Sequence, residues 1–98
     1  MGQPFTQTTW RVRAGQEDEF VRRWAEFAEW GALQGLTAKA QLLQDMDDPR
    51  LFVSFGPWES ADSIMRWRAT TGFHERLARL QEVLETFEPR TLELVRPG

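Results

Sequence analysis

His74 is the only histidine in the sequence, and it is the side chain best suited to proton transfer. An imidazole titrates near neutral pH, so it can act as a base or as a hydrogen-bond donor. His74 follows Phe73 and is expected beside an apolar helical stripe. There it is either a catalytic base at the edge of a pocket or a half-exposed helix residue. Cysteine and tyrosine are absent, which excludes disulfides, thiolate chemistry and a phenol acid within these residues.

Aromatic side chains are abundant, with five tryptophans and seven phenylalanines. Most are expected in the core, because aromatic rings dominate core burial. Trp24 and Trp67 each lie on an apolar helical face, where core and pocket wall stay open as alternatives. Trp58 follows a predicted strand and is expected to fill the turn into the next helix.

Length and charge restrict the class of protein. The chain has 98 residues, which predicts a single domain over residues 1–98. The net charge is -3, and the basic residues are scattered among acids, so no nucleic-acid partner is expected. The first residues lack the features of a signal peptide, and no apolar run approaches the roughly 20 residues of a membrane helix. We therefore expect a cytoplasmic protein without a membrane partner.

In the first half of the chain, apolar and polar residues first alternate as in a strand and then follow a helical spacing. Residues 6–13 predict a strand, with Thr8, Trp10 and Val12 on one face. Ala14 and Gly15 end it. Three acids at 17–19 open a helix, where they complement the helix dipole. An apolar stripe follows at i, i+4, i+7 and i+11: Phe20, Trp24, Phe27 and Gly31. This helix is expected to end between residues 30 and 35.

The second half predicts two more strands, a broken helix and a last strand. Residues 36–44 and 50–56 are the strands, and the second is apolar on both faces. Ser60 is the expected N-cap of a helix that residues 70–72 interrupt. A longer helical stripe then comprises Phe73, Leu77, Leu80, Leu84 and Phe87, and Pro89 is expected to end it. Residues 91–96 form the last predicted strand.

The predicted order is β-α-β-β-α-β, the ferredoxin-like arrangement of the α+β class. It places four strands in one antiparallel sheet, with the helices on one face. The other face would be bare in a monomer, yet residues 50–56 are apolar on that side too. An exposed apolar face indicates a partner, and a symmetric homodimer is the commonest solution.

Two segments resemble the antibiotic biosynthesis monooxygenase domain family. They are residues 55–63 (FGPWESADS), followed by Trp67 and Phe73, and residues 12–20 (VRAGQEDEF). The resemblance extends over residues 6–95 as one domain. It implies a dimeric α+β barrel, in which two four-stranded sheets pack face to face.

The resemblance also implies a pocket between helices and sheet. In active members, this pocket holds a phenol or quinone precursor, and oxygen is inserted without flavin, haem or metal. Carried over to this sequence, it implies a small aromatic substrate, no cofactor, and His74 as the catalytic residue. The implied substrate-binding residues are Phe20, Trp24, Trp67 and Phe73. The alternative is a non-catalytic dimeric barrel with a structural or ligand-binding role.

A second branch of the superfamily degrades haem and shares a tryptophan at the position of Trp67. That branch has an asparagine in the first strand and a haem-ligating histidine on the later helix. The matching positions here are Thr8 and Leu77, so the resemblance disfavours haem degradation.

Overall fold

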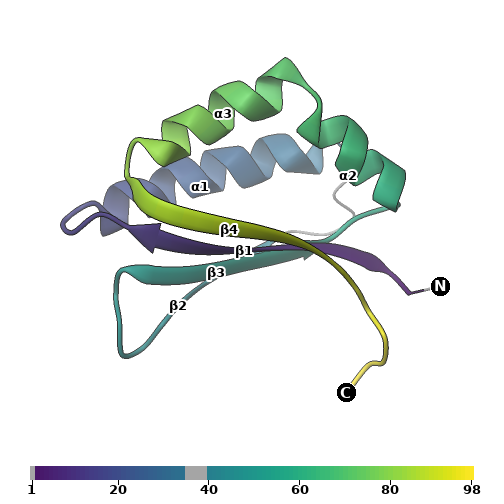
Figure 1. Cartoon of the computed structure of the whole chain (residues 1–98), viewed down its shortest axis with the longest axis horizontal. Coiled ribbons are helices and arrows are strands. Elements are labelled where there is room, and N and C mark those ends of the chain that lie inside the picture. Colours follow the sequence, from purple (N-terminus) through teal and green to yellow (C-terminus); the bar gives the residue numbers. More distant parts are fainter. Residues whose placement is uncertain (1, 35–39) are drawn as a thin grey trace.

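Four antiparallel strands form one sheet, and three helices cover one of its faces (Figure 1). This computed structural model describes residues 2–34 and 40–98. The strand order is β2-β3-β1-β4, with every neighbouring pair antiparallel. The ferredoxin-like α+β prediction is therefore confirmed. In chain order the elements are β1 (Pro4–Val12), α1 (Glu17–Ala32), β2 (Gln41–Gln44), β3 (Leu51–Pro57), α2 (Ala61–Arg68), α3 (Thr71–Gln81) and β4 (Leu84–Glu93).

Side-chain alternation along β1 and β3 separates the two faces of the sheet. Trp10 and Phe52 pair in register and are 3% and 2% exposed, because both lie under the helices. The intervening residues of β3, Leu51 and Val53, lie on the opposite face. The two-sided apolar character predicted for this strand is thus present, with each face using alternate residues.

Local signals set the helix boundaries. Gly15 has a φ of +83°, a conformation that glycine adopts without steric cost, and it makes the turn into α1. Ser60 caps α2 as predicted, since its hydroxyl accepts from the Ser63 amide at 3.1 Å. Thr70 caps α3 in the same way, accepting from the Phe73 amide at 3.1 Å. The break predicted at 70–72 is the junction between α2 and α3.

The prediction that one helix continues through Leu84 and Phe87 to Pro89 is wrong. Helix α3 ends at Gln81, and β4 begins at Leu84, seven residues before the predicted start of the last strand. A β-bulge explains the false signal. Leu84 pairs with Val12 and Thr86 pairs with Arg11, so Glu85 is an extra residue. One extra residue puts two side chains three positions apart on the same face, which imitates helical spacing.

Pro89 lies inside β4, where it pairs with Thr8. Proline is tolerated in a strand at a sheet edge, because its missing N–H is not needed on the outer side. β4 is such an edge strand. The expected helix stop is thus an edge-strand residue.

The other predicted boundaries differ by smaller amounts. β1 begins two residues before the predicted start. The second predicted strand, 36–44, contains β2 only at Gln41–Gln44, and its part at 36–39 lies outside the described residues.

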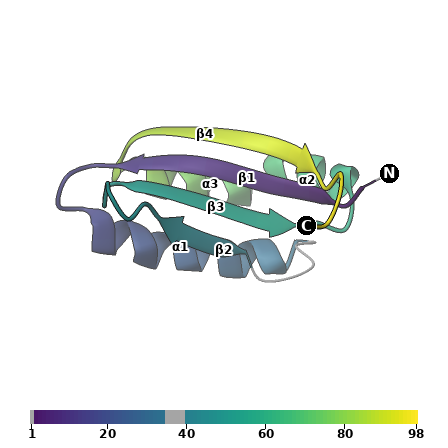
Figure 2. The ribbon, with the colours of Figure 1, turned by 90° about the horizontal axis from the view of Figure 1, so that it is seen from below.

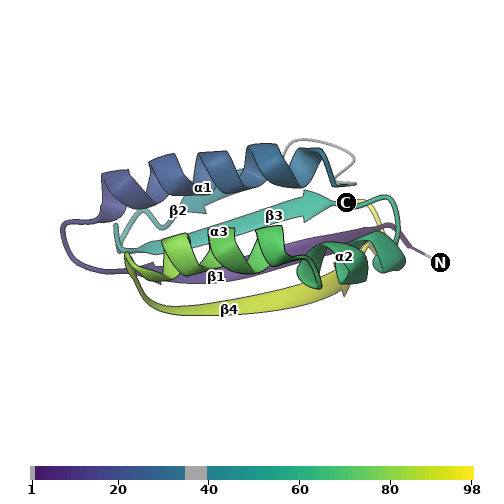
Figure 3. The same ribbon diagram turned by 90° about the horizontal axis from the view of Figure 1, so that it is seen from above.

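Helices α1 and α3 run side by side over the sheet, with α2 beyond one end of α3 (Figure 3). The core between these layers is a cluster of buried apolar side chains, including Trp10, Val12, Phe20, Phe52 and Leu80. Figure 2 shows the opposite face, with the sheet in front of the helices. None of the helices in the described segments has the length and apolar character needed to cross a membrane.

Candidate functional site

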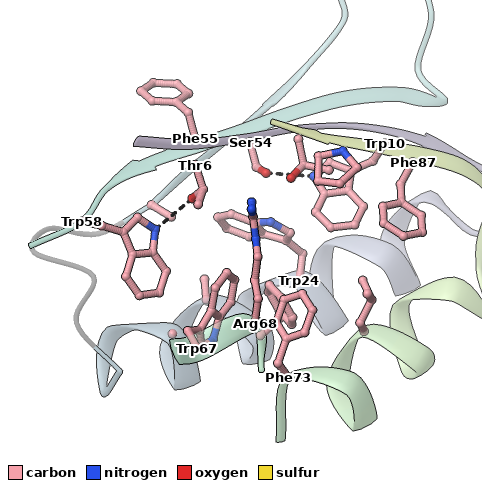
Figure 4. Close-up of a pocket in the computed structure, with 17 residues that line it drawn as sticks. Thr6, Trp10, Trp24, Ser54, Phe55, Trp58, Trp67, Arg68, Phe73 and Phe87 are labelled. Atoms are coloured by element: carbon pink, nitrogen blue, oxygen red, sulfur yellow. Dashed lines mark hydrogen bonds between the residues drawn. The ribbon is translucent and has the colours of Figure 1, made fainter. Parts of the chain in front are cut away.

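A cavity of about 260 Å³ lies between the helices and the sheet (Figure 4). Its volume is just below the roughly 300–1,000 Å³ range of small-molecule sites. All three helices and three of the strands contribute to it. The principal lining side chains are Thr6, Thr8, Trp10, Trp24, Phe27, Ala28, Ser54, Trp58, Trp67, Arg68, Phe73, Leu77, Phe87 and Pro89.

Aromatic rings form one wall of this cavity. The Trp67 ring lies 4.7 Å from the ring of Trp58 and 4.7 Å from that of Phe73, centroid to centroid. Phe27 meets Trp67 edge-on at 5.4 Å. Because each ring supports the next, the wall is held by packing and presents apolar surface to the cavity.

Two indole–hydroxyl pairs line the sheet side of the cavity (Figure 4). Trp58 Nε1 donates to Thr6 Oγ1 at 2.9 Å, and Trp10 Nε1 donates to Ser54 Oγ at 2.9 Å. A hydroxyl that accepts a hydrogen bond still has its own proton to donate. These pairs therefore hold two hydroxyl donors at the surface of a mainly apolar cavity.

Arg68 is the charged residue among the described lining residues. Its side chain rises from the end of α2 toward the sheet, between Thr6 and Ser54 as seen in Figure 4. The guanidinium donates to Thr91 Oγ1 at 2.8 Å. Burial lowers the pKa of Arg68 from its usual value. The group nevertheless stays protonated at neutral pH, since an arginine is not deprotonated in proteins.

The structure brings together three of the predicted substrate-binding residues. Trp24, Trp67 and Phe73 all line the cavity. Phe20 does not: it is fully buried between Trp10 and Phe52, at centroid distances of 5.6 Å and 5.0 Å. Phe20 is a core residue that packs against Trp10, which itself lines the cavity.

His74, the predicted catalytic residue, is exposed on α3 and is not among the described lining residues. Its ring lies 5.5 Å from the Phe73 ring, centroid to centroid, and is nearly perpendicular to it. The structure therefore favours the half-exposed alternative over the pocket-edge base.

The polar residues of the cavity were not identified from sequence. The alternation of the strands could have identified the hydroxyls. Thr6 lies on the same face of β1 as Trp10, and Ser54 lies on the same face of β3 as Phe52. A polar residue at a buried position of a strand requires a partner. No comparable signal distinguishes Arg68, which is one of eleven arginines.

The two positions that mark the haem-degrading branch both face this cavity. Thr8 and Leu77 are lining residues. Leucine carries no atom that could ligate iron, and threonine replaces the asparagine. Within the described residues, no group of three or more His, Asp or Glu side chains could hold a metal ion.

Fold and site together define a ferredoxin-like α+β protein with a pocket lined by aromatic rings between the helices and the sheet. The chain belongs to the antibiotic biosynthesis monooxygenase family, whose match extends over residues 5–79. No curated protein matches the sequence significantly.

Solved structures share the fold over nearly the whole chain. SnoaB, a cofactor-independent oxygenase from Streptomyces nogalater, is 22% identical with a TM-score of 0.88, covering 99% of this chain and 97% of its own. A Bordetella bronchiseptica protein provisionally named an antibiotic biosynthesis monooxygenase is 18% identical with a TM-score of 0.86, covering 98% and 100%. PA3566 from Pseudomonas aeruginosa is 16% identical with a TM-score of 0.80, covering 98% and 97%.

Proposed function

We propose that this protein is a cofactor-independent monooxygenase acting on a small polycyclic aromatic substrate of the phenol or quinone-precursor type. The observation that carries the proposal is the cavity whose wall is Trp67, Phe73 and Trp24. A flat aromatic substrate fits between such rings, because offset and edge-on ring contacts add to the gain from burying apolar area. SnoaB, a cofactor-independent oxygenase of the same fold, supports the type of reaction.

The reaction is the replacement of two hydrogens on a substrate carbon by one oxygen atom of O₂, while the other atom leaves as water. Triplet oxygen reacts slowly with closed-shell molecules, but an electron-rich phenolate or carbanion can pass it one electron. The protein then has three tasks: to orient the rings, to exclude water from the reacting carbon, and to stabilise the substrate oxyanion. The aromatic wall serves the first two, and the donors on the sheet side serve the third.

Oxygen uptake with a panel of anthrones and hydroquinones tests this proposal. The purified protein, treated with a metal chelator, should consume oxygen with at least one panel member. Ala28→Trp places an indole in the cavity from α1 and should abolish that uptake. Ala25→Trp is the matched control, since Ala25 is exposed on the same helix and does not line the cavity. Equal uptake by the two variants would contradict a role for the cavity.

A non-catalytic ligand-binding role is the second candidate. The described lining residues include no carboxylate and no imidazole, so the cavity offers no evident base. Binding of panel members that is blocked by Ala28→Trp, with no oxygen uptake by any variant, would favour this candidate.

We also propose that the protein is a homodimer, assembled through the sheet face away from the helices. Strand alternation places Phe5, Leu51, Val53, Phe55 and Leu92 on that face. Leu92 is 46% exposed in the single chain, and Leu43 on β2 is 54% exposed. Covering such a face gains roughly 25 cal/mol per Å² of apolar area. Sedimentation at micromolar concentration should give twice the chain mass of 11.5 kDa; a stable monomer would refute the dimer. The cytoplasmic location predicted from sequence remains a prediction.

A further inference from the structure

Arg68 differs from the other half-buried arginines of the described chain, because neither a carboxylate nor an aromatic ring is described as a partner of its charge. Three of them pair with carboxylates, Arg11, Arg23 and Arg50. Arg76 lies over the Trp30 ring at 4.4 Å. Arg68 contacts a neutral hydroxyl, that of Thr91, and no described ion pair includes it. Removing a cation from water is costly unless an anion compensates. An unpaired guanidinium that faces a cavity therefore indicates an anionic ligand.

The elements around Arg68 supply no competing anion to the cavity. On α2, Asp62 is an exposed residue of the first turn, away from Arg68 at the C-terminal end. On β4, Glu88 and Arg90 lie on the opposite sheet face, while the Glu93 carboxylate accepts from the Gly2 amide at 3.2 Å. On α3, His74 and Glu75 are exposed, and neither lines the cavity.

The neutral polar groups beside Arg68 also favour an anionic ligand. The Thr6 and Ser54 hydroxyls each accept from an indole, so each has a proton available for a ligand oxygen. One cation and two hydroxyl donors thus converge on the sheet side of an apolar cavity (Figure 4). This is the arrangement that stabilises an oxygen anion, because preorganised donors meet the charge beside an apolar wall.

We propose that Arg68, with the Thr6 and Ser54 hydroxyls, forms an oxyanion site that binds the substrate as its phenolate or enolate. The substrate O–H bond is broken on binding, the electron pair stays on the substrate oxygen, and the proton passes to bulk solvent. This assignment requires a substrate with an acidic hydroxyl or enol, which the proposed phenol-type substrate has. This inference rests on the proposed function and specifies how the pocket ionises its substrate without a base of its own.

The test follows the ionisation of a bound dye. The probe is 2-hydroxyanthraquinone, whose neutral and anionic forms differ in visible absorption. Bound to the wild-type protein, its pKa should be lower than in free solution by about 1–3 units, the effect of an opposite charge within contact distance. In Arg68→Gln the pKa should return to the free value or rise above it, because an apolar cavity disfavours the anion. Arg68→Lys keeps the charge and should keep part of the shift.

Arg66→Gln is the matched control. Arg66 is exposed on the same helix, and its replacement changes the net charge equally. This variant should keep the full shift of the dye pKa. If Arg66→Gln and Arg68→Gln lose the shift equally, the effect is one of overall charge, and the oxyanion site is refuted.

A second dye separates the failure of this inference from the failure of the proposed function. The probe 2-methoxyanthraquinone has the same rings and no acidic proton, so it should bind wild type and Arg68→Gln with similar affinity. If it binds while the pKa of the hydroxyl dye is unshifted or raised in wild type, the aromatic pocket stands and the oxyanion site is refuted. If neither dye binds, the aromatic pocket and the oxyanion site both fail.

Discussion

The indole nitrogen of Trp10 on β1 donates a 2.9 Å hydrogen bond to the hydroxyl of Ser54 on β3. Trp10 is 3% exposed and Ser54 is 7% exposed, so both partners of this hydrogen bond are buried. The bond joins the core to the candidate site, because both residues also line the cavity.

Ser54→Ala should lower the free energy of unfolding by about 1–3 kcal/mol, the cost of leaving a buried donor unpaired. Urea unfolding measures this change. In a Trp10→Phe background the same substitution should cost less, since no indole proton is then left without an acceptor. An equal cost in both backgrounds would show that the hydrogen bond contributes nothing specific.

Ser60→Ala should destabilise the protein by about 1 kcal/mol through loss of the α2 N-cap. The Ser60 hydroxyl accepts from the Ser63 amide, and the Ser63 hydroxyl accepts from the Ser60 amide, both at 3.1 Å. In a domain of this size the melting temperature should fall by roughly 4–8 °C. Ser60→Asp preserves an N-cap acceptor and should recover most of the loss; a fall as large as that of Ser60→Ala would count against capping.

Val53→Glu should convert the proposed dimer to monomer. Val53 lies at the centre of the face away from the helices, between Thr9 on β1 and Leu43 on β2. A carboxylate buried there without a partner costs several kcal/mol per subunit. Sedimentation should show half the wild-type mass. Ala78→Glu on α3, an exposed helix position, is the control and should leave the mass unchanged.

Acid should weaken the fold partly through Glu19. The hydrogen bond from Arg22 is the largest cause, and that from Arg23 the second, of a Glu19 pKa below its usual value of 4.5. A carboxyl with a lowered folded-state pKa contributes stability above its unfolded pKa, and this contribution is lost as the pH falls through the folded pKa. The unfolding free energy of Glu19→Gln should therefore decline less steeply than that of wild type below about pH 5.

Urea titrations across the acid range measure that slope. Glu29→Gln, on the exposed side of the same helix and in no described ion pair, should decline as wild type does. Parallel curves for Glu19→Gln and wild type would contradict the role given to Glu19.

The sequence predicted the fold well where one face of an element is buried and the other is wet. The alternation of buried and exposed side chains along β1 and the capping of α2 by Ser60 were both predictable, because each depends on residues close together in the chain. The end of α3 was not, since Leu84 and Phe87 owe their common face to a bulge against β1. Such a bulge depends on strand pairing between residues about seventy positions apart.

The aromatic residues of the candidate site were predictable from the sequence, whereas its charged residue was not. Trp24, Trp67 and Phe73 stand out as large apolar side chains on helical faces. Arg68 directly follows Trp67 in the sequence. Its position in the cavity depends on the orientation of α2 relative to the sheet, which the local sequence does not determine. His74 had the right chemistry for a base, but its position on α3 directs it to solvent.

The extra residue at Glu85 also determines where in β4 an insertion or deletion can be tolerated. A relative that lacks one residue there would have a regular strand and could keep Phe87 and Pro89 opposite Trp10 and Thr8. A deletion further along β4 would instead move every later side chain to the other face of the sheet. Insertions and deletions among homologues should therefore be concentrated between α3 and Thr86.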